Sequence, residues 1–146
     1  MKIIFVCLGN ICRSPMAEFI MKNLCKNTNY TISSAGTSGY HDGEDMHIKT
    51  KEILLQNNIK CDGFISKKLD KFHCQNNDLI LTMDESNYNF ITTNFSNFKD
   101  KVKPLCNYCD LGYKNVPDPW YTGNFNEVYT VINNSCKNLL KELDKC

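Results

Sequence analysis

The sequence predicts an α/β fold: a single domain over residues 1–146, with a four-stranded parallel sheet and helices on both faces. Three observations lead to this prediction. Short apolar runs alternate along the chain with segments whose apolar residues recur at helical spacing. The first run, residues 2–7, is apolar after its opening lysine, as expected of a strand buried on both faces. No internal repeat or linker interrupts the alternation, and the length suits one domain.

The first half of the chain contains two predicted strands and two predicted helices. After the strand at residues 2–7, Ser14 and Pro15 are typical of a helix N-cap followed by a proline in the first turn. Residues 30–35 form the second predicted strand, because β-favouring residues end there at a glycine. Residues 47–56 have apolar side chains at the spacing of a second helix.

The second half continues the same alternation. A short helix is expected at residues 67–72, with Ser66 as its N-cap. Residues 79–83 form a third buried strand with a helix after it, and residues 102–105 form the fourth strand. A long loop, residues 106–123, leads into an amphipathic helix. The apolar face of that helix consists of Phe125, Val128, Ile132, Cys136, Leu139, Leu140 and Leu143.

Composition and charge exclude several classes of function. The net charge of +1 gives no general attraction to nucleic acid or to a membrane surface. No run reaches the ~20 apolar residues of a membrane span, and the N-terminal run is too short for a secretory signal. We therefore expect a cytoplasmic location, in which the nine cysteines are mostly thiols.

The stretch CLGNICRS, residues 7–14, joins the first strand to the first helix. In parallel α/β sheets the active site lies beyond the carboxyl ends of the strands, which is where this loop falls. Gly9 and Asn10 tolerate positive φ, so the loop can turn successive backbone N–H groups inward as an anion-binding nest. Arg13, the sole arginine of the chain, can bind two phosphate oxygens at once. The predicted phosphate-binding residues are Leu8, Gly9, Asn10, Ile11, Cys12 and Arg13.

Cys7 is the predicted nucleophile of this loop. A helix N-terminus and a nearby cation favour the thiolate over the thiol, and the thiolate is the reactive form. A separate base is not required, and the three histidines, His41, His47 and His73, all lie in polar sequence contexts. A cysteine six residues before an arginine also arises by chance. A strand end, Gly and Asn inside the loop, and Arg-Ser-Pro after it are a far more restrictive combination.

The loop CLGNICRSP resembles the active-site signature of the low-molecular-weight protein tyrosine phosphatases, Cys-x5-Arg-Ser/Thr. Three further segments resemble the family in the same order: SSAGTSGY at 33–40, LTMDESN at 81–87 and PDPWY at 117–121. The resemblance covers essentially the whole chain. It implies a phosphoric monoester hydrolase that cleaves phosphotyrosine and aryl phosphates through a cysteinyl-phosphate intermediate.

The resemblance also implies roles for individual residues. Asp118 is the implied general acid and base, because a phenol with a pKa near ~10 leaves poorly without a proton. Ser14 is implied to assist Cys7 as a leaving group. Asn10 corresponds to the residue that organises the loop, and Ser34 to its hydrogen-bond partner. A histidine that completes this network in many members should fall near residues 62–64, where this chain reads Asp-Gly-Phe.

The substrate cleft and a redox role follow from the same resemblance. Tyr40, Trp120 and Tyr121 fall where the family places aromatic walls for a phosphotyrosine ring. Without the family, core packing or surface exposure is the favoured explanation for these three residues. Cys12 is implied as a resolving thiol that traps oxidised Cys7 as a disulfide, the alternative being a small buried side chain.

Neither a metal nor a cofactor is expected, because Arg13 and the loop amides already supply positive charge. The expected partners are phosphotyrosine-containing proteins or peptides, with inorganic phosphate as product and inhibitor. We expect a monomer that binds neither nucleic acid nor membrane, since the fold needs no partner to be complete.

Two other functions remain to be weighed. Thioredoxin-coupled arsenate reductases share the fold and the loop, but carry a relay cysteine pair in the segment that matches residues 81–90. Here Met83 occupies the first relay position and the segment lacks cysteine. A non-catalytic phosphate-binding module would be expected if the nucleophile, arginine or acid were missing. Cys106 and Cys109 form a CxxC pair without the further ligands of a zinc site, so we expect a structural or incidental role.

Overall fold

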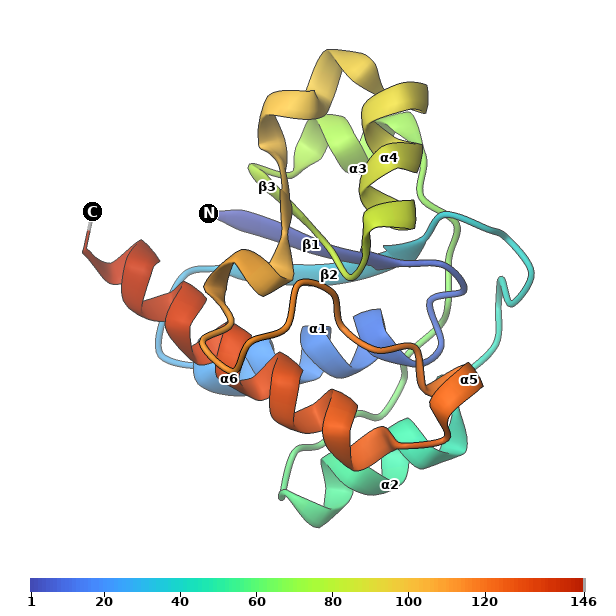
Figure 1. Cartoon of the computed structure of the whole chain (residues 1–146), viewed down its shortest axis with the longest axis vertical. Helices are drawn as coiled ribbons and strands as arrows, with labels where there is room; N and C mark the ends of the chain where they lie inside the picture. The colour runs from blue at the N-terminus through green and yellow to red at the C-terminus, as the bar shows by residue number, and fades with distance from the viewer. Residues whose placement is uncertain (146) are drawn as a thin grey trace.

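Four parallel strands form one sheet in the order β2-β1-β3-β4 (Figure 1). The computed structural model describes residues 1–145. The strands are β1 (Lys2–Cys7), β2 (Thr31–Gly36), β3 (Leu79–Thr82) and β4 (Val102–Pro104). In the register of the sheet, Cys7 pairs with Gly36 of β2, and Val6 pairs with Thr82 of β3. The carboxyl ends of the three neighbouring strands therefore meet at one edge of the sheet.

Helices cover both faces of this sheet, which confirms the predicted fold class (Figure 1). On one face lie α1 (Arg13–Leu24) and the long α6 (Phe125–Asp144), with α2 (Ile48–Gln56) packed against both. On the other face lie α3 (Lys71–Asn76) and α4 (Glu85–Asn94). The shorter elements are α5 (Pro119–Thr122) and two 3₁₀ helices, η1 (Ser96–Lys101) and η2 (Leu105–Tyr108). Within the described residues, no helix combines the length and the apolar character that crossing a membrane requires.

The central strand β1 is buried because its side chains alternate between two cores. Ile3 and Phe5 join the larger core beneath α1 and α6, whereas Ile4 and Val6 join the smaller core beneath α3 and α4. All four side chains are fully buried. Burial of each contributes roughly 1.5–3 kcal/mol, so the strand is held firmly from both sides. Its last residue, Cys7, thereby has a fixed position at the edge of the sheet.

The N-cap predicted at Ser14 is wrong. The N-cap lies two residues earlier, at Cys12, so helix α1 begins at Arg13, and no side chain caps the helix. The hydroxyl of Ser14 lies in the first turn, where it contacts Asn10 and Cys7 instead. Pro15 remains compatible with this start, since the first four N–H groups of a helix have no intrahelical partner.

The helix predicted at residues 67–72 is also misplaced. The structure has α3 four residues later, where the side chain of Asp70 accepts a hydrogen bond from the backbone N–H of His73 at 2.9 Å. The ring of His73 in turn accepts from the backbone N–H of Asp70, so the two residues form a capping box. Ser66 caps no helix, because its hydroxyl donates to a carbonyl of the first loop.

Helix α3 is fastened at its carboxyl end by a lysine from a distant part of the chain. The ammonium group of Lys101 donates hydrogen bonds to the carbonyl oxygens of Cys74, Gln75 and Asn77, at 3.0, 3.1 and 2.9 Å. The last carbonyls of a helix lack intrahelical partners and carry partial negative charge. Lys101 satisfies these carbonyls at the point where η1 leads into β4.

We expect Lys101→Met to lower the free energy of unfolding by about 1–2 kcal/mol, because charge-assisted hydrogen bonds to the carbonyls are lost. Thermal unfolding followed by circular dichroism should show a melting temperature lower by roughly 2–6 °C. Lys103→Met is the matched control, since Lys103 is exposed on β4. Equal melting temperatures for the two variants would contradict the proposed fastening.

Candidate active site

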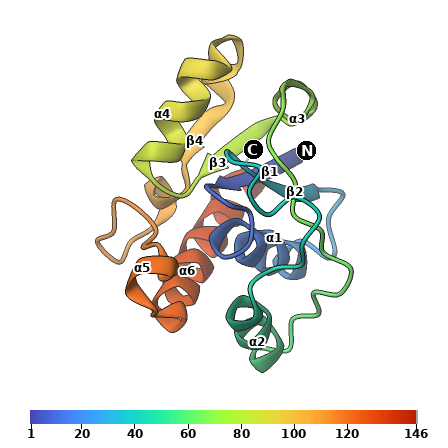
Figure 2. The ribbon, with the colours of Figure 1, turned by 90° about the vertical axis from the view of Figure 1, so that its right-hand side faces the viewer.

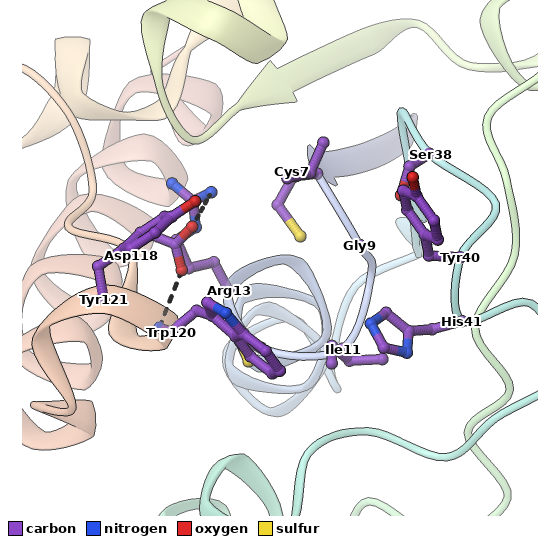
Figure 3. Close-up of a pocket in the computed structure, with 12 residues that line it drawn as sticks. Cys7, Gly9, Ile11, Arg13, Ser38, Tyr40, His41, Asp118, Trp120 and Tyr121 are labelled. Carbon is purple, nitrogen blue, oxygen red and sulfur yellow. Dashed lines mark hydrogen bonds and ion pairs between the residues drawn. The ribbon is translucent and has the colours of Figure 1, made fainter.

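The loop after β1 lies at the carboxyl edge of the sheet, as predicted. Figure 2 faces this side of the molecule and shows the loop between α5 and the segment that follows β2. Cys7 is buried, with 3% of its surface exposed, and its sulfur points into a pocket (Figure 3). Asn10 has a φ of 56°, in the left-handed region that the sequence led us to expect for this loop.

Two hydrogen-bonding groups contact the sulfur of Cys7. The backbone N–H of Asn10 donates to it at 3.3 Å, and the hydroxyl oxygen of Ser14 lies 3.0 Å from it. The backbone N–H is a donor, and the hydroxyl group can also donate a hydrogen bond to the sulfur. Cys12 is different: burial, together with the charges of Cys7 and Asp118, raises the pKa of its thiol to about 12. The loop therefore places one sulfur among donors and keeps the other protonated.

The side chain of Asn10 holds the loop to three other segments. Its Nδ2 donates to Ser14 Oγ at 2.8 Å and to Ser34 Oγ at 2.9 Å. Its Oδ1 accepts from the backbone N–H of Lys67 at 3.0 Å, and its backbone carbonyl accepts from Ser66 Oγ at 2.5 Å. The structure thus places Ser34 beside Asn10, as the family resemblance implied. The contacts from residues 66 and 67 were not foreseen, since nothing local in the sequence marks them.

Strand β2 supports the loop from below. A side chain at Gly36 would bring its Cβ to 2.8 Å from the carbonyl oxygen of Leu8 and 3.0 Å from the backbone nitrogen of Asn10. Glycine therefore allows the loop backbone to lie directly on the strand end. Beyond it, the backbone N–H groups of Thr37 and Ser38 donate to the carbonyls of Cys7 and Leu8, both at 2.9 Å.

The guanidinium of Arg13 is buried and is held in place by contacts within the chain. Its Nη1 donates to Asp84 Oδ2 at 2.8 Å and to the carbonyl of Val116 at 3.1 Å. Its Nη2 lies 3.5 Å from Asp118 Oδ2. Burial disfavours the charged form, but the charge of Cys7 and the hydrogen bond to Asp84 outweigh it, so the pKa of Arg13 is raised. Asp84, which caps α4, was not predicted to contact the site.

Asp118 lies at the start of α5 and faces the same pocket (Figure 3). One of its oxygens accepts from the backbone N–H of Trp120 at 3.0 Å, which makes it the N-cap of this short helix. The other oxygen is the one near Arg13. The carboxylate is 24% exposed, so solvent and a bound ligand can both reach it.

The pocket has a volume of about 150 Å³ and brings together three separate segments. Aromatic rings stand at its rim: Tyr40, Trp120 and Tyr121 are 88%, 65% and 82% exposed. These three residues were predicted from the family resemblance to form the cleft, and all three line the pocket. His41, on the opposite side from Asp118 in Figure 3, was not foreseen. The complete lining is Cys7, Leu8, Gly9, Ile11, Cys12, Arg13, Ser38, Tyr40, His41, Asp118, Trp120 and Tyr121.

The remaining cysteines lie away from this pocket's lining. Each cysteine among residues 1–145 is a free thiol. Within the same residues, no cluster of His, Cys, Asp and Glu side chains has the composition to hold a metal ion. Cys106 and Cys109 lie in and just after η2, which packs on α6, and burial raises the pKa of Cys106 to about 12. This placement agrees with a structural role for the CxxC pair.

Comparison with known proteins agrees with the geometry. Residues 2–146 match the family model described as low molecular weight phosphotyrosine protein phosphatase. The chain is 40% identical over 144 residues to the Staphylococcus aureus protein named low molecular weight protein-tyrosine-phosphatase PtpA, covering 97% of this chain and 92% of that one.

Solved structures show the same relationship. YfkJ from Bacillus subtilis superposes with a TM-score of 0.94 at 38% identity, covering 99% of this chain and 95% of that one. The YwlE arginine phosphatase of the same organism superposes with a TM-score of 0.89 at 29% identity, covering 99% and 97% of the two chains. That structure is of a cysteine-to-serine mutant with a phosphorylated active site serine. The present chain belongs to the low molecular weight phosphotyrosine protein phosphatase family.

Proposed function

We propose that this protein hydrolyses phosphotyrosine in proteins and peptides, and aryl phosphates, with Cys7 as the nucleophile. One observation carries the proposal. The sulfur of Cys7 lies in a pocket, in contact with a backbone N–H and a hydroxyl group, and Arg13 lines the same pocket. The phosphorylated active site serine of the YwlE mutant supports a covalent phospho-enzyme in this family.

In the first step the thiolate of Cys7 attacks phosphorus in line with the ester oxygen. The S–P bond forms as the P–O bond to the phenol breaks, and Asp118 gives its proton to the departing oxygen. Arg13 and the inward-facing loop amides bind the equatorial oxygens as charge develops. A metal is not part of this proposal, because these groups supply the positive field.

In the second step the carboxylate of Asp118 takes a proton from water, whose oxygen attacks the cysteinyl-phosphate. The S–P bond breaks, and Cys7 leaves as a thiolate that accepts a hydrogen bond from Ser14. Inorganic phosphate is released, and it inhibits by occupying the same loop. The Ser14 contact to sulfur at 3.0 Å supports this role.

We propose that phosphate binding beside Arg13 converts Asp118 to its acid form. Oδ2 of Asp118 lies 3.5 Å from Nη2 of Arg13. A phosphate dianion that binds between them competes for Nη2 and places negative charge beside the carboxyl group. Both effects favour the protonated form of Asp118, which is the form that the first step needs. Asp84 and the carbonyl of Val116 meanwhile keep Nη1 fixed.

The lining of the pocket favours an aryl group over a guanidinium. Leu8, Ile11 and the exposed rings at the rim offer flat apolar contact to a phenyl ring. A phosphorylated arginine would bring several N–H donors that need acceptors. Asp118 is the one carboxylate among the described lining residues, and in this mechanism it protonates the leaving group. Tyrosine phosphate is therefore the substrate class that we propose.

We expect Cys7→Ser to abolish hydrolysis of p-nitrophenyl phosphate and of a phosphotyrosine peptide, because a serine hydroxyl is not ionised at neutral pH. Steady-state release of phosphate measures the loss, and an unchanged circular dichroism spectrum shows that the variant folds. Turnover retained by this variant would rule out the proposed nucleophile. Faster hydrolysis of phosphoarginine than of phosphotyrosine by the unaltered protein would overturn the substrate class.

Asp118→Ala should damage turnover most for substrates whose leaving group has a high pKa, because these leaving groups need a proton in the transition state. A series of aryl phosphates measured by kcat/KM should show a loss of roughly 10²–10⁴ for phenols of high pKa. Phenols of low pKa should lose much less. An equal loss across the whole series would remove Asp118 from the role of acid, and would leave it as a residue that only shapes the pocket.

We also propose that Cys12 protects Cys7 from irreversible oxidation. Peroxide converts the thiolate of Cys7 to a sulfenic acid and is reduced to hydroxide. The thiol of Cys12 then displaces hydroxide, which leaves as water, and a disulfide forms. The charge of Cys7 contributes to the raised pKa of Cys12, and conversion to a neutral sulfenic acid removes that contribution. A cytoplasmic location, where thiols are kept reduced, belongs to the same proposal.

Brief treatment with hydrogen peroxide should inactivate the protein, and dithiothreitol should restore nearly all of the activity. Cys12→Ser should be inactivated as well, but without the partner thiol most of its activity should not return. Mass spectrometry of the oxidised protein should find Cys7 and Cys12 linked. Full recovery of the Cys12→Ser variant, or irreversible loss in the unaltered protein, would contradict a resolving role.

A further inference from the structure

Helix α1 carries a buried carboxylate that the mechanism does not use. Glu18 is 6% exposed, although burying a charged group away from water is unfavourable unless the group is paired. Its Oε1 accepts a hydrogen bond from Ser34 Oγ at 2.6 Å. Its Oε2 contacts Lys22 Nζ at 2.7 Å, one turn further along the helix, where the lysine side chain is 45% exposed. The carboxylate therefore connects the protein surface with the network beneath the loop.

The directions of the hydrogen bonds in this network follow from the chemistry of its two ends. An ionised carboxylate can only accept, so the hydroxyl of Ser34 donates to Glu18. A backbone N–H can only donate, so the contact from Lys67 fixes Oδ1 of Asn10 on that side. Nδ2 of Asn10 therefore faces the two serines, and gives one hydrogen to Ser34 and one to Ser14.

The same reasoning orients the hydroxyl of Ser14 toward the nucleophile. Its oxygen accepts from Asn10, so its own hydrogen needs an acceptor. The sulfur of Cys7 lies at 3.0 Å and the carbonyl of Ala35 at 3.5 Å, so the sulfur is the nearer acceptor. Ser14 then donates to Cys7. We call this series of hydrogen bonds the loop relay. It leads from Glu18 through Ser34, Asn10 and Ser14 to Cys7.

Taking Cys7 as the nucleophile proposed above, we propose that Glu18 is a positioning residue for it. As the acceptor of the Ser34 hydrogen, Glu18 keeps the oxygen of Ser34 turned toward Asn10. Asn10 is then held where it directs Ser14 onto the sulfur. Near residues 62–64, where the family resemblance places a histidine, Phe64 is buried against the ring of Phe19 with centroids 6.0 Å apart. In this chain the acceptor comes from α1 instead.

Other charged groups surround the two ends of the loop relay. Lys22 faces Glu18, while Arg13, Asp118, Cys12 and His41 share the pocket with Cys7. The negative charge of Glu18 acting through space would disfavour a thiolate. Glu18 acting through hydrogen bonds favours it, because Ser14 is kept as a donor. The two modes thus predict opposite effects on Cys7 when the carboxylate is removed, which makes them separable.

The experiment compares Glu18→Met, which fills a similar volume without an acceptor, with Glu18→Gln, which keeps an oxygen for Ser34. Alkylation of Cys7 by iodoacetamide, followed by mass spectrometry of its peptide across pH, reports the thiolate directly. In Glu18→Met we expect the midpoint of this profile to move to higher pH and kcat to fall about tenfold or more, with KM little changed. Glu18→Gln should recover most of both. Glu52→Ala, at an exposed position on α2, is the control without effect.

If Glu18→Met alone does not fold, the double variant Ser34→Ala/Glu18→Met provides a second test. It lacks the Ser34 hydroxyl, so no hydroxyl group is left without the carboxylate as its acceptor. In the Ser34→Ala background, Glu18→Met should not shift the alkylation midpoint further. An unchanged midpoint in Glu18→Met, a shift to lower pH, or equal losses in the Met and Gln variants would overturn the proposal. Alkylation does not depend on turnover. Failure of the proposed function would therefore appear as turnover by Cys7→Ser and not in this profile.

Discussion

The left-handed backbone of Asn10 is the constraint on which the active-site loop depends. At this residue the chain reverses, so that its N–H points back at the sulfur of Cys7. The conformation costs roughly 1–2 kcal/mol for a residue with a Cβ, and Asn bears it better than most. The cost is offset because the same side chain makes three hydrogen bonds at once. Glycine would adopt the conformation with less strain, but it would leave Ser14, Ser34 and Lys67 without their common partner. Asn10 therefore both adopts the backbone conformation that the loop needs and binds the loop to the neighbouring segments.

Arg13 imposes a second constraint, which joins parts of the chain that are far apart in sequence. Arg13 is the first residue of α1. It donates one hydrogen bond to Asp84, the N-cap of α4, and another to the carbonyl of Val116 in the loop before α5. A buried ion pair is weak support for stability, since desolvation cancels much of the attraction. Its value here lies in geometry: Asp84 and Val116 fix Nη1, so the remaining donors already face the pocket. A lysine has one ammonium group and cannot bind Asp84 and a phosphate with separate edges.

The features predictable from the sequence are those with a local signal. The apolar run of β1, the glycine and asparagine of the loop, and the arginine six residues after Cys7 all lie within one short stretch. The caps assigned to Ser14 and Ser66 failed because tertiary contacts with Asn10 compete for the same hydroxyl groups. Asp84 and Glu18 had no signal pointing to the site. Asp84 is 71 residues from Arg13 and has the sequence of an ordinary helix cap, and Glu18 resembles any helical glutamate until β2 brings Ser34 beside it.

The mechanism that we propose couples ligand binding to proton uptake through the charges in the pocket. Cys7, Asp84 and Asp118 all act on a single guanidinium, and each favours its charged form. A phosphate dianion brings further negative charge to this pocket, where Arg13, the helix N-terminus and the loop amides supply the positive field. Asp84 lies on the Nη1 side of Arg13, together with a backbone carbonyl, and keeps its ion pair. Asp118 is the group whose contact with Arg13 a phosphate can replace. Its side chain is partly exposed, and its Oδ2 lies 3.5 Å from Nη2 of Arg13. In the mechanism that we propose, protonation of that carboxyl group as the phosphate binds reduces the repulsion and supplies the acid for cleavage.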